Sequence, residues 1–463
     1  MNKNLKEKLK EIEKIAKEEL NLDYYPVQWE VVGQEVLLEV MSYGLPSRSR
    51  HWSYGQSYEY QKMQGEMGHS KVYELVLNND PSYAFLLDTN SDIANIMVMA
   101  HVLGHSACFK HNYLFKQTDN KMVYHAAERA RRIDDYIEKH GLKAVEHIMD
   151  VAFSMDKNID WHRGVLRKPY GKGLPKKSYK ARAGHKDEFV DILGTPKKKK
   201  ERKPPTFPPH PEYDLLWFLI QHANLEDWER DIFEIIREES YYFYPQYVTQ
   251  RLNEGIASWI HAEIMYRMKS ITEAEYLEFV KIHERVVQPG GNKLKINPYF
   301  LGFTLLNDIK KRWDKKFEDG ESEINGLEKI YEVVANEDDV SFVRTYLTKE
   351  IAEGLKLFCY KYIKDQKAGK IIKIISTDLD DVVENLISDC YGYRAPELCI
   401  VKASHEGLEL EHTSGDIGTL DPKHLEKVMG YLFEVWGAPV NVQTIDDDGE
   451  ELHYTRDELG FSG

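Results

Sequence analysis

An apolar run at residues 93–103 leads into two histidines four residues apart, His101 and His105. Ser91 precedes the run as a helix N-cap, and a helix here would bury most of its surface. Residues i and i+4 share one face of a helix, so the two imidazoles can hold one metal ion. A zinc peptidase with His-Glu-x-x-His carries its general base at the second position, which here is Val102. The pair therefore predicts a metal site but not its chemistry.

Three further side chains are predicted as metal ligands. His125 and Glu128 open the next predicted helix, three residues apart on one face, and a helix-turn-helix would return one of them to the pair. His261 lies seven residues after Glu254 on one face of a later helix. Mixed imidazole and carboxylate ligands suit zinc, manganese or iron, and we expect a divalent metal, with zinc first. Hydrogen-bonded core histidines without metal are the alternative interpretation.

Two glutamates are predicted on inward helix faces and are candidate catalytic bases. The ridge of Ile232, Ile235 and Ile236 places Glu239 inward, and Glu254 shares its face with apolar residues. A buried carboxylate must be paired, bind a metal or be protonated, because burying it alone costs several kcal/mol. The alternative for Glu239 is an ion pair with Arg129, Arg131 or Arg251.

A short cationic and aromatic loop is a candidate substrate-binding site. Guanidinium groups bind carboxylates and phosphates through paired hydrogen bonds. A structural ion-pair loop is an equal alternative. The loop contains Arg48, Arg50, His51 and Trp52.

The composition restricts the class of protein. A net charge of −15 argues against nucleic-acid binding, which requires a basic surface. We find no apolar stretch of about 20 residues, and the first twenty positions are too charged for a signal peptide. The four cysteines form no Cys-x-x-Cys pair, which fits a reducing compartment and gives no thiolate zinc site. We therefore expect a cytoplasmic protein without a membrane span.

We expect an α+β fold in which a mainly α-helical N-terminal core carries the metal site. Residues 1–166 and 212–330 are its two predicted parts, and 167–211 form a basic Pro- and Lys-rich excursion between them. The excursion is interpreted as a surface linker, or alternatively as a docking segment for an acidic partner. Residues 331–463 are a predicted accessory domain whose elements follow the ferredoxin-like order β-α-β-β-α-β. The strands are expected at 370–375, 398–403, 408–412 and 440–445, and the helices at 379–390 and 422–436.

Several motifs together resemble the SpoVR family, stage V sporulation protein R. They are His-Trp-Ser-Tyr-Gly at 51–55, Ala-His-Val-Leu-Gly-His at 100–105, the segment 228–243 that begins Trp-Glu-Arg-Asp-Ile, and Asn-Glu-Gly-Ile-Ala-Ser-Trp-Ile-His at 253–261. The resemblance runs from near the start to about Trp313, and the tail matches the family's separate C-terminal domain.

The resemblance implies a role in spore cortex (peptidoglycan) formation, with a PrkA-type serine kinase and a YhbH-like protein as partners. Residues 253–255 are also similar to the glutamate-bearing helix of metallopeptidases, so Glu239 or Glu254 is expected to replace the missing base. The predicted function is a metal-dependent amide or peptide hydrolase. The alternatives are a non-enzymatic protein that docks the kinase and a di-metal carboxylate oxidase. The oxidase is less favoured because the chain lacks a clean pair of helical Glu-x-x-His motifs.

Overall fold

The structure is a computed structural model, and the part of the chain that it describes divides into two compact units. The first consists of Met1–Glu146 and Glu239–Arg394, the second of His147–Glu238 and Ala395–Gly463. Helices dominate the first unit and a five-stranded sheet lies in the second, which confirms the predicted α+β class. The described residues are 1–66, 74–170, 207–290, 294–365, 369–388, 390, 395–412, 419–446 and 449–463.

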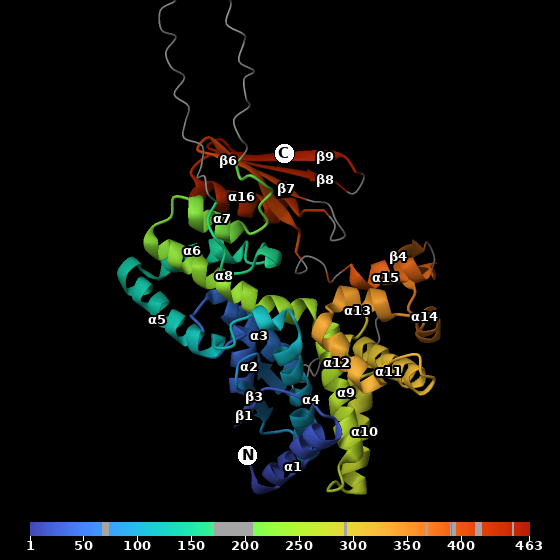
Figure 1. The fold of residues 1–463 in the computed structure, drawn as a ribbon. Helices are drawn as coiled ribbons and strands as arrows, with labels where there is room; N and C mark the ends of the chain where they lie inside the picture. Colours follow the sequence, from blue (N-terminus) through green and yellow to red (C-terminus); the bar gives the residue numbers. More distant parts are fainter. Residues whose placement is uncertain are drawn as a thin grey trace, which may run out of the picture. The chain divides into compact units, whose positions relative to one another are not determined.

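Two long helices, α4 (Asp92–His111) and α9 (Gln250–Arg267), lie side by side in the first unit (Figure 1). The predicted cap of α4 is confirmed, since the Ser91 hydroxyl accepts a hydrogen bond from an amide of the first turn. The two backbones approach closely at Gly104, where a Cβ atom would lie 2.6 Å from Ala257 Cα. Only glycine fits at this position, so Gly104 allows α9 to reach the histidine pair.

A three-stranded sheet in the order β1-β3-β2 contacts α4. β1 (Val27–Val32) runs parallel to β3 (Ser82–Leu87), and β2 (Glu74–Leu77) pairs antiparallel with β3. Side chains alternate between the two faces of a strand. Val76 packs into the apolar core around α4, whereas Leu77 packs into a smaller cluster on the other face. Glu74, two residues before Val76, therefore lies on the face that contacts α4.

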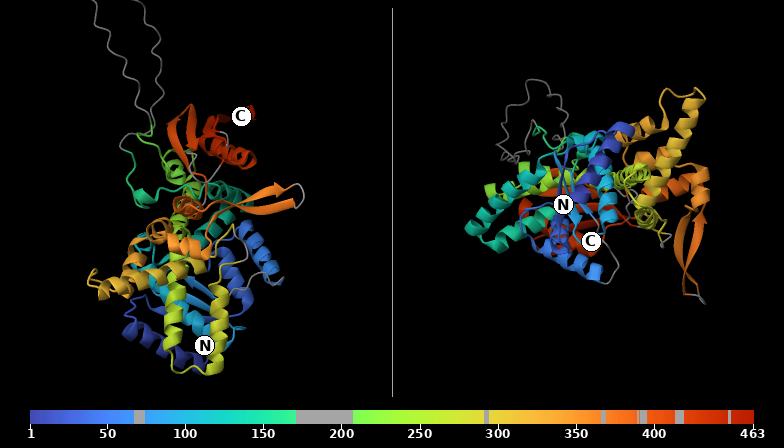
Figure 2. Two further views of the ribbon diagram at one scale, coloured as in Figure 1. Left: turned by 90° about the vertical axis from the view of Figure 1, so that its right-hand side faces the viewer. Right: turned by 90° about the horizontal axis from the view of Figure 1, so that it is seen from below.

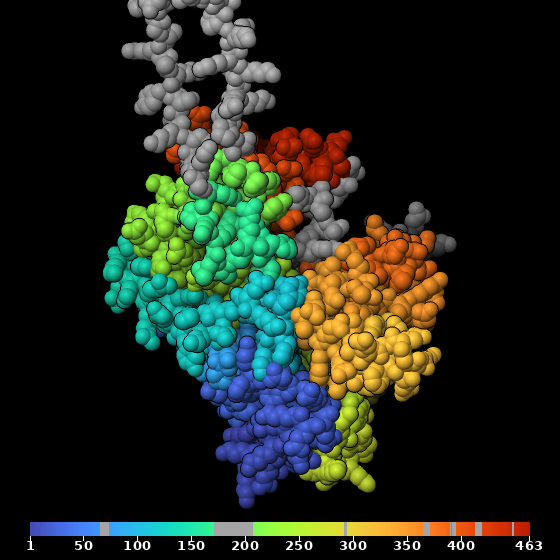
Figure 3. Space-filling view, viewed as in Figure 1, coloured from blue at the N-terminus to red at the C-terminus, as the bar shows by residue number. Residues whose placement is uncertain are grey.

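The other elements of the first unit surround this centre. α9 also packs closely on α11 (Pro298–Glu318), since a Cβ on Gly255 would lie 2.7 Å from the Gly302 backbone. Figure 3 shows the residues after α4 (cyan) in contact with those of α12 (yellow-orange), where the Tyr113 amide donates to the Ala335 carbonyl. The β4–β5 ribbon extends away from the neighbouring helices (Figure 2). The remaining bounds are α1 (Lys3–Lys14), a π-helix (Ile15–Glu19), α2 (Gln34–Tyr43), α3 (Trp52–Glu66), a 3-10 turn (Phe115–Gln117), α5 (Met122–His140), α10 (Glu273–Val286), α12 (Gly326–Asn336), α13 (Asp339–Tyr346), α14 (Lys349–Leu355), β4 (Cys359–Asp365), β5 (Gly369–Ser376) and α15 (Leu379–Ile387).

The second unit is built on a sheet in the order β10-β9-β8-β7-β6. Neighbouring strands are antiparallel except β7 and β8, which are parallel and are connected by the crossover helix α16. Helix α8 continues across the boundary between the units in sequence, between Glu238 and Glu239. The bounds are α6 (Leu142–Phe153), a 3-10 turn (Trp161–Arg163), α7 (Leu215–His222), α8 (Asp227–Val248), β6 (Leu398–Ser404), β7 (Gly407–His412), α16 (Pro422–Trp436), β8 (Val440–Ile445), β9 (Glu451–Asp457) and β10 (Gly460–Ser462).

The ferredoxin-like arrangement of the C-terminal segment is not confirmed. All six predicted elements form, but β5 and α15 belong to the first unit and only the later four to the second. The physical reason is the strand β4, which the sequence pattern did not indicate and which pairs with β5 in a separate ribbon. The predicted domain boundaries at 166, 211 and 330 stay predictions, since the compact units combine segments from both halves of the chain.

Two other predictions concern the excursion and membranes. Most of the predicted excursion at 167–211 lies outside the described residues, which resume at Phe207. Among the helices of the described part of the chain, we find none that is both long and apolar enough to cross a membrane.

Candidate metal centre

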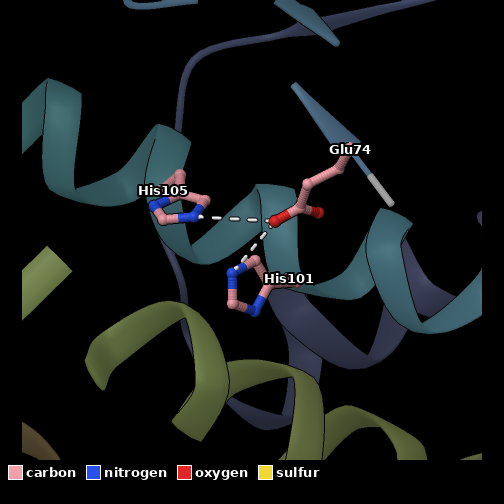
Figure 4. Close-up of side chains that lie close together, drawn as sticks. All are labelled: Glu74, His101 and His105. Carbon is pink, nitrogen blue, oxygen red and sulfur yellow. Dashed lines mark ion pairs between the residues drawn. The ribbon is translucent and has the colours of Figure 1, made fainter. Parts of the chain in front are cut away.

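Two residues of α4 and one of β2 form a group of possible metal ligands. One ligand atom each of Glu74, His101 and His105 lies within 4.8 Å of the other two. Glu74 Oε1 is 3.2 Å from His101 Nε2 and 3.9 Å from His105 Nε2. Figure 4 shows the carboxylate of the strand directed at both rings of the helix. Two imidazoles and one carboxylate are the ligand set of several zinc peptidases.

A second carboxylate approaches the same two rings from α9. Glu254 Oε2 lies 3.5 Å from Nε2 of His101 and 3.5 Å from Nε2 of His105. Tyr299, in the first turn of α11, lies beside Glu254, and the two groups shift each other's pKa: Tyr299 helps to lower that of Glu254, and Glu254 raises that of Tyr299 well above its usual value. The close packing at Gly104 is what permits Glu254 to reach these atoms from another helix.

The far nitrogens of the two histidines are held by neighbouring side chains. His105 Nδ1 donates to Asn253 Oδ1 over 2.9 Å, which leaves Nε2 as the acceptor that faces the carboxylates. His101 Nδ1 lies 2.9 Å from His261 Nδ1, and His261 Nε2 lies 2.7 Å from His283 Nδ1. Partners of this kind set the tautomer and orientation of a metal-binding histidine.

Three polar atoms of these residues are buried without a hydrogen bond. Two of them, His101 Nε2 and Glu254 Oε2, face each other over 3.5 Å, and the third is Glu74 Oε2, the carboxylate oxygen that is not directed at the rings. A buried polar atom without a partner costs about 1–3 kcal/mol. A divalent cation held by His101, His105 and Glu74 would take up the free lone pair of His101 Nε2 and offset the negative charge of the carboxylates, so the residues present fit a metal.

The protonation states of the group also fit a metal. Burial lowers the pKa of His101 to about 4 and that of His261 well below its usual value, so both rings are neutral near pH 7, the form that binds metals. Burial, and next the charge of Glu254, raise the pKa of Glu74 well above its usual value. Burial would also raise the pKa of Glu254, but His105, His101 and Tyr299 lower it overall. Without a cation, therefore, the negative charge is favoured on Glu254 rather than on Glu74.

Comparison with known proteins identifies the family. The family model described as "SpoVR like protein" matches residues 1–392. The chain belongs to the SpoVR family. It is similar to "Uncharacterized protein YcgB" of Escherichia coli (strain K12), with 29% identity over 477 residues that cover 95% of this chain and 92% of that protein. No solved structure matches. The resemblance seen in the motifs is thus confirmed.

Glu239 of this SpoVR-family protein is not part of the ligand group. Its buried carboxylate accepts hydrogen bonds from Arg48 Nε, at 2.8 Å, and from the Arg48 Nη2 group. Arg48 also donates to the Tyr43 carbonyl over 2.9 Å and lies over the Phe243 ring. The ion-pair alternative describes this carboxylate, although the partner is Arg48 rather than one of the three arginines considered.

The other residues of the predicted substrate loop are placed differently from one another. Arg50 is exposed, and the buried His51 bonds to Ser53 Oγ through Nδ1 over 2.7 Å. Trp52 is 55% exposed and begins α3. None of these side chains is in the ligand group of the described residues.

His125 and Glu128 also lie outside the group. α5 packs its apolar residues Met122 and Ala126 into a cluster with Tyr242, so the helix turns His125 and Glu128 away from that buried face. His125 Nδ1 bonds to the Asp119 carboxylate, and Glu128 is exposed. His261 reaches the group as the partner of His101 rather than as one of the clustered ligand atoms.

Sequence reasoning missed Glu74, Asn253, Tyr299 and His283 in the SpoVR-family site. Glu74 lies in β2, where an acid two residues from Val76 shares its face with an apolar side chain. That alternation was the available signal. The positions of Asn253 and Tyr299 follow from the packing of α4, α9 and α11, which spacing along the chain does not specify.

A cavity with a volume of about 450 Å³ adjoins the ligand group. His105, Glu74 and Glu254 open into it, and every lining residue belongs to the first unit. This volume is in the range of small-molecule sites. The lining consists of Met41, Gly44, Glu74, Leu75, Val76, Leu77, His105, Phe109, Phe243, Gln246, Tyr247, Gln250, Asn253, Glu254 and Tyr299.

Proposed function

We propose that this SpoVR-family protein is a metal-dependent hydrolase of amide or peptide bonds. The observation that carries the proposal is that two carboxylate oxygens, Glu74 Oε1 and Glu254 Oε2, each lie within 3.9 Å of Nε2 of both His101 and His105, beside a cavity. His101, His105 and Glu74 would hold the metal. Zinc is the first candidate because two histidines and a glutamate bind catalytic zinc in known peptidases, with manganese and iron as alternatives.

Each residue has a separate task in this mechanism. A divalent metal, when bound, polarises a carbonyl and makes water acidic enough to lose a proton near neutral pH. Glu254 would accept that proton at Oε2 and deliver it to the leaving amine, the task that the glutamate of His-Glu-x-x-His performs. Asn253 and His261 keep the two ligand rings oriented. Tyr299, which lines the cavity beside Glu254, would donate a hydrogen bond to the substrate carbonyl.

The biological setting follows from the family alone. SpoVR membership supports a role in sporulation, and we extend the proposal to spore cortex peptidoglycan, a cytoplasmic location, and a PrkA-type kinase and a YhbH-like protein as partners. A protein that binds metal but hydrolyses nothing would favour the alternative of a non-enzymatic partner of the kinase. Two metal equivalents with a visible charge-transfer band would favour the di-metal oxidase.

The first test is elemental analysis of protein purified without chelator or affinity-column nickel. One equivalent of metal is expected in the wild type and in His125→Ala, a matched helical histidine outside the ligand group. The double variant His101→Ala/His105→Ala should hold none while keeping its circular dichroism spectrum. If the wild type binds no metal even after reconstitution, the proposal is wrong.

The second test separates the base from the ligands. Glu254→Gln should keep its metal and lower the hydrolysis of peptidoglycan stem peptides by about 10²–10⁴-fold, the usual contribution of a general base. Glu239→Gln is the matched control, since its carboxylate pairs with Arg48, and it should retain metal and rate wherever it remains folded. Equal rates in Glu254→Gln and wild type would remove Glu254 from the mechanism.

A further inference from the structure

Strand β2 has one open edge among the described strands. It pairs with β3 on one side, and no other described strand pairs with it on the opposite side. An edge strand presents a row of backbone N–H and C=O groups that can accept a further strand. Because Glu74 is the first residue of β2, the open edge runs directly past a proposed metal ligand.

The cavity beside the ligand group extends along this strand. All four residues of β2 line it, together with His105 and Glu254. The side chains of Gln246, Gln250 and Asn253, from the end of α8 and the start of α9, contribute amide groups to the same cavity. Amide side chains both donate and accept hydrogen bonds, as peptide groups do.

The lining also restricts the charge of what it can bind. Among the described residues that line it, Glu74 and Glu254 are the only acidic or basic side chains, histidine aside. A substrate carboxylate or phosphate would therefore be desolvated without a cationic side chain to pair with it. Phe109, Phe243 and Tyr247 add apolar and aromatic surface instead.

We propose that the substrate of this site is an extended, uncharged polypeptide segment that adds to the open edge of β2 as a further strand. The inference rests on the proposed function and specifies its substrate class. Backbone hydrogen bonds to β2 would hold the segment in register, and its alternate side chains would enter the cavity. A peptide bond beside Glu74 would then lie next to His101, His105 and Glu254.

The decisive experiment measures peptide binding without turnover. The full-length Glu254→Gln protein, loaded with zinc, is titrated with end-blocked octapeptides of alternating Val and Thr in a calorimeter. The same peptide is then N-methylated at one position at a time. Strand addition predicts a period of two, because alternate amides bond to β2. Affinity should fall about 3–10-fold at every second position, the loss expected for one hydrogen bond, with little change between them.

Two outcomes would overturn the inference. One is a bound peptide whose affinity is equally insensitive, or equally sensitive, to N-methylation at every position. The other is stoichiometric zinc with no peptide binding, or with tighter binding of a control octapeptide that carries Glu at two central positions. Failure of the proposed function is distinguishable from both, because it would appear in the wild type, either as the absence of bound zinc or as zinc-loaded protein that hydrolyses no peptide.

A pair of variants tests the strand itself. Consecutive residues of a strand direct their amides to opposite edges, so in Leu75→Pro and Val76→Pro one proline removes a donor to β3 and the other a donor to the open edge. The melting temperature shows which proline removed the amide at the open edge, because that variant stays folded and keeps its zinc. That variant should bind the peptide at least 3-fold more weakly. Leu75→Ala and Val76→Ala are the controls. Unchanged affinity in a folded proline variant of each residue contradicts the proposal, and the N-methyl series decides if both variants unfold.

Discussion

Two pairs of neighbouring carboxylates, one in each unit, differ in how their charge is balanced. In the second unit Glu212 and Asp214 have side chains with 0% exposure, and each is paired with arginine. Arg167 and Tyr170 donate to Glu212, and Arg237 Nε donates to Asp214 over 2.9 Å. In the first unit Glu74 and Glu254 both face His101 and His105. Among the described residues, no lysine or arginine forms an ion pair with either carboxylate.

The difference favours a structural role for Glu212 and Asp214 and makes Glu74 and Glu254 the candidate metal site. An arginine balances the charge of Glu212 and of Asp214, and Arg48 does the same for Glu239 within the first unit. Glu74 and Glu254 have no such cationic partner among the described residues, and their side chains are 20% and 19% exposed where they line the cavity. Carboxylates whose charge no basic side chain balances, and which a cavity makes accessible, are suited to bind a cation.

The largest expected effect comes from breaking a completed pair. Arg237→Ala should destabilise the second unit by about 3–5 kcal/mol, because Asp214 would stay buried with an uncompensated charge. Urea unfolding followed by circular dichroism measures the change. The control is Arg237→Met/Asp214→Leu, which removes both charges and should cost much less. Equal losses in the single and double variants would show that the pair is not coupled.

The next effect comes from adding zinc to the group of Glu74, His101 and His105. Zinc at a hundred times its dissociation constant should stabilise the wild type by about 2.7 kcal/mol, since it binds the folded chain alone. His101→Ala/His105→Ala should lose this gain entirely, and His125→Ala should retain it. Thermal melts with and without zinc measure both. A zinc-induced gain that persists in the double variant would place the metal elsewhere.

A smaller effect, a gain in stability, is expected when the acid Glu74 is replaced. In the metal-free protein Glu74→Gln should raise the free energy of unfolding by about 1 kcal/mol, because a carboxyl group buried beside Glu254 becomes a neutral amide. The same variant should lose zinc. Glu128→Gln, on an exposed residue, is the control and should change neither. Destabilisation of the metal-free protein by Glu74→Gln would mean that this cluster is already complete without a cation.

The last expected effect concerns pH and the second unit. Burial lowers the pKa of His222 from 6.5 to about 4, among the rings of Tyr170, Phe207 and Phe218. The unfolded chain takes up a proton near pH 6.5 and the folded chain only near pH 4, so stability falls as the pH drops between these values. His222→Phe should flatten this part of the stability profile. Unfolding titrations of both proteins from pH 7 to pH 4 measure it, and parallel profiles would contradict the assignment.

Sequence reasoning reached part of the site and stopped for a definable reason. The i, i+4 histidines and the Ser91 cap are local features, and the helix forms as its own residues require. The inward face of α9 was also predicted from periodicity, and it carries Glu254 and His261 to the group. His125 was predicted from the length of chain between the helices, and the structure instead places it beside Asp119, on a helix that packs on another cluster. Domain assignment of the tail met the same limit, since β5 pairs with β4 rather than with the later strands.

The sequence by itself determined the α+β class, the histidine-bearing helix, the family motifs and the net charge, because each depends on composition or on residues a few positions apart. Only the tertiary structure decided that Glu74 faces the histidines, that Glu239 belongs to Arg48, and that Glu254 lies close enough to act on the same site. These depend on the register of β2 against β3 and on the approach of α4 to α9 at Gly104. Contacts of this kind join residues far apart in the chain, and the packing of whole elements specifies them, not local spacing.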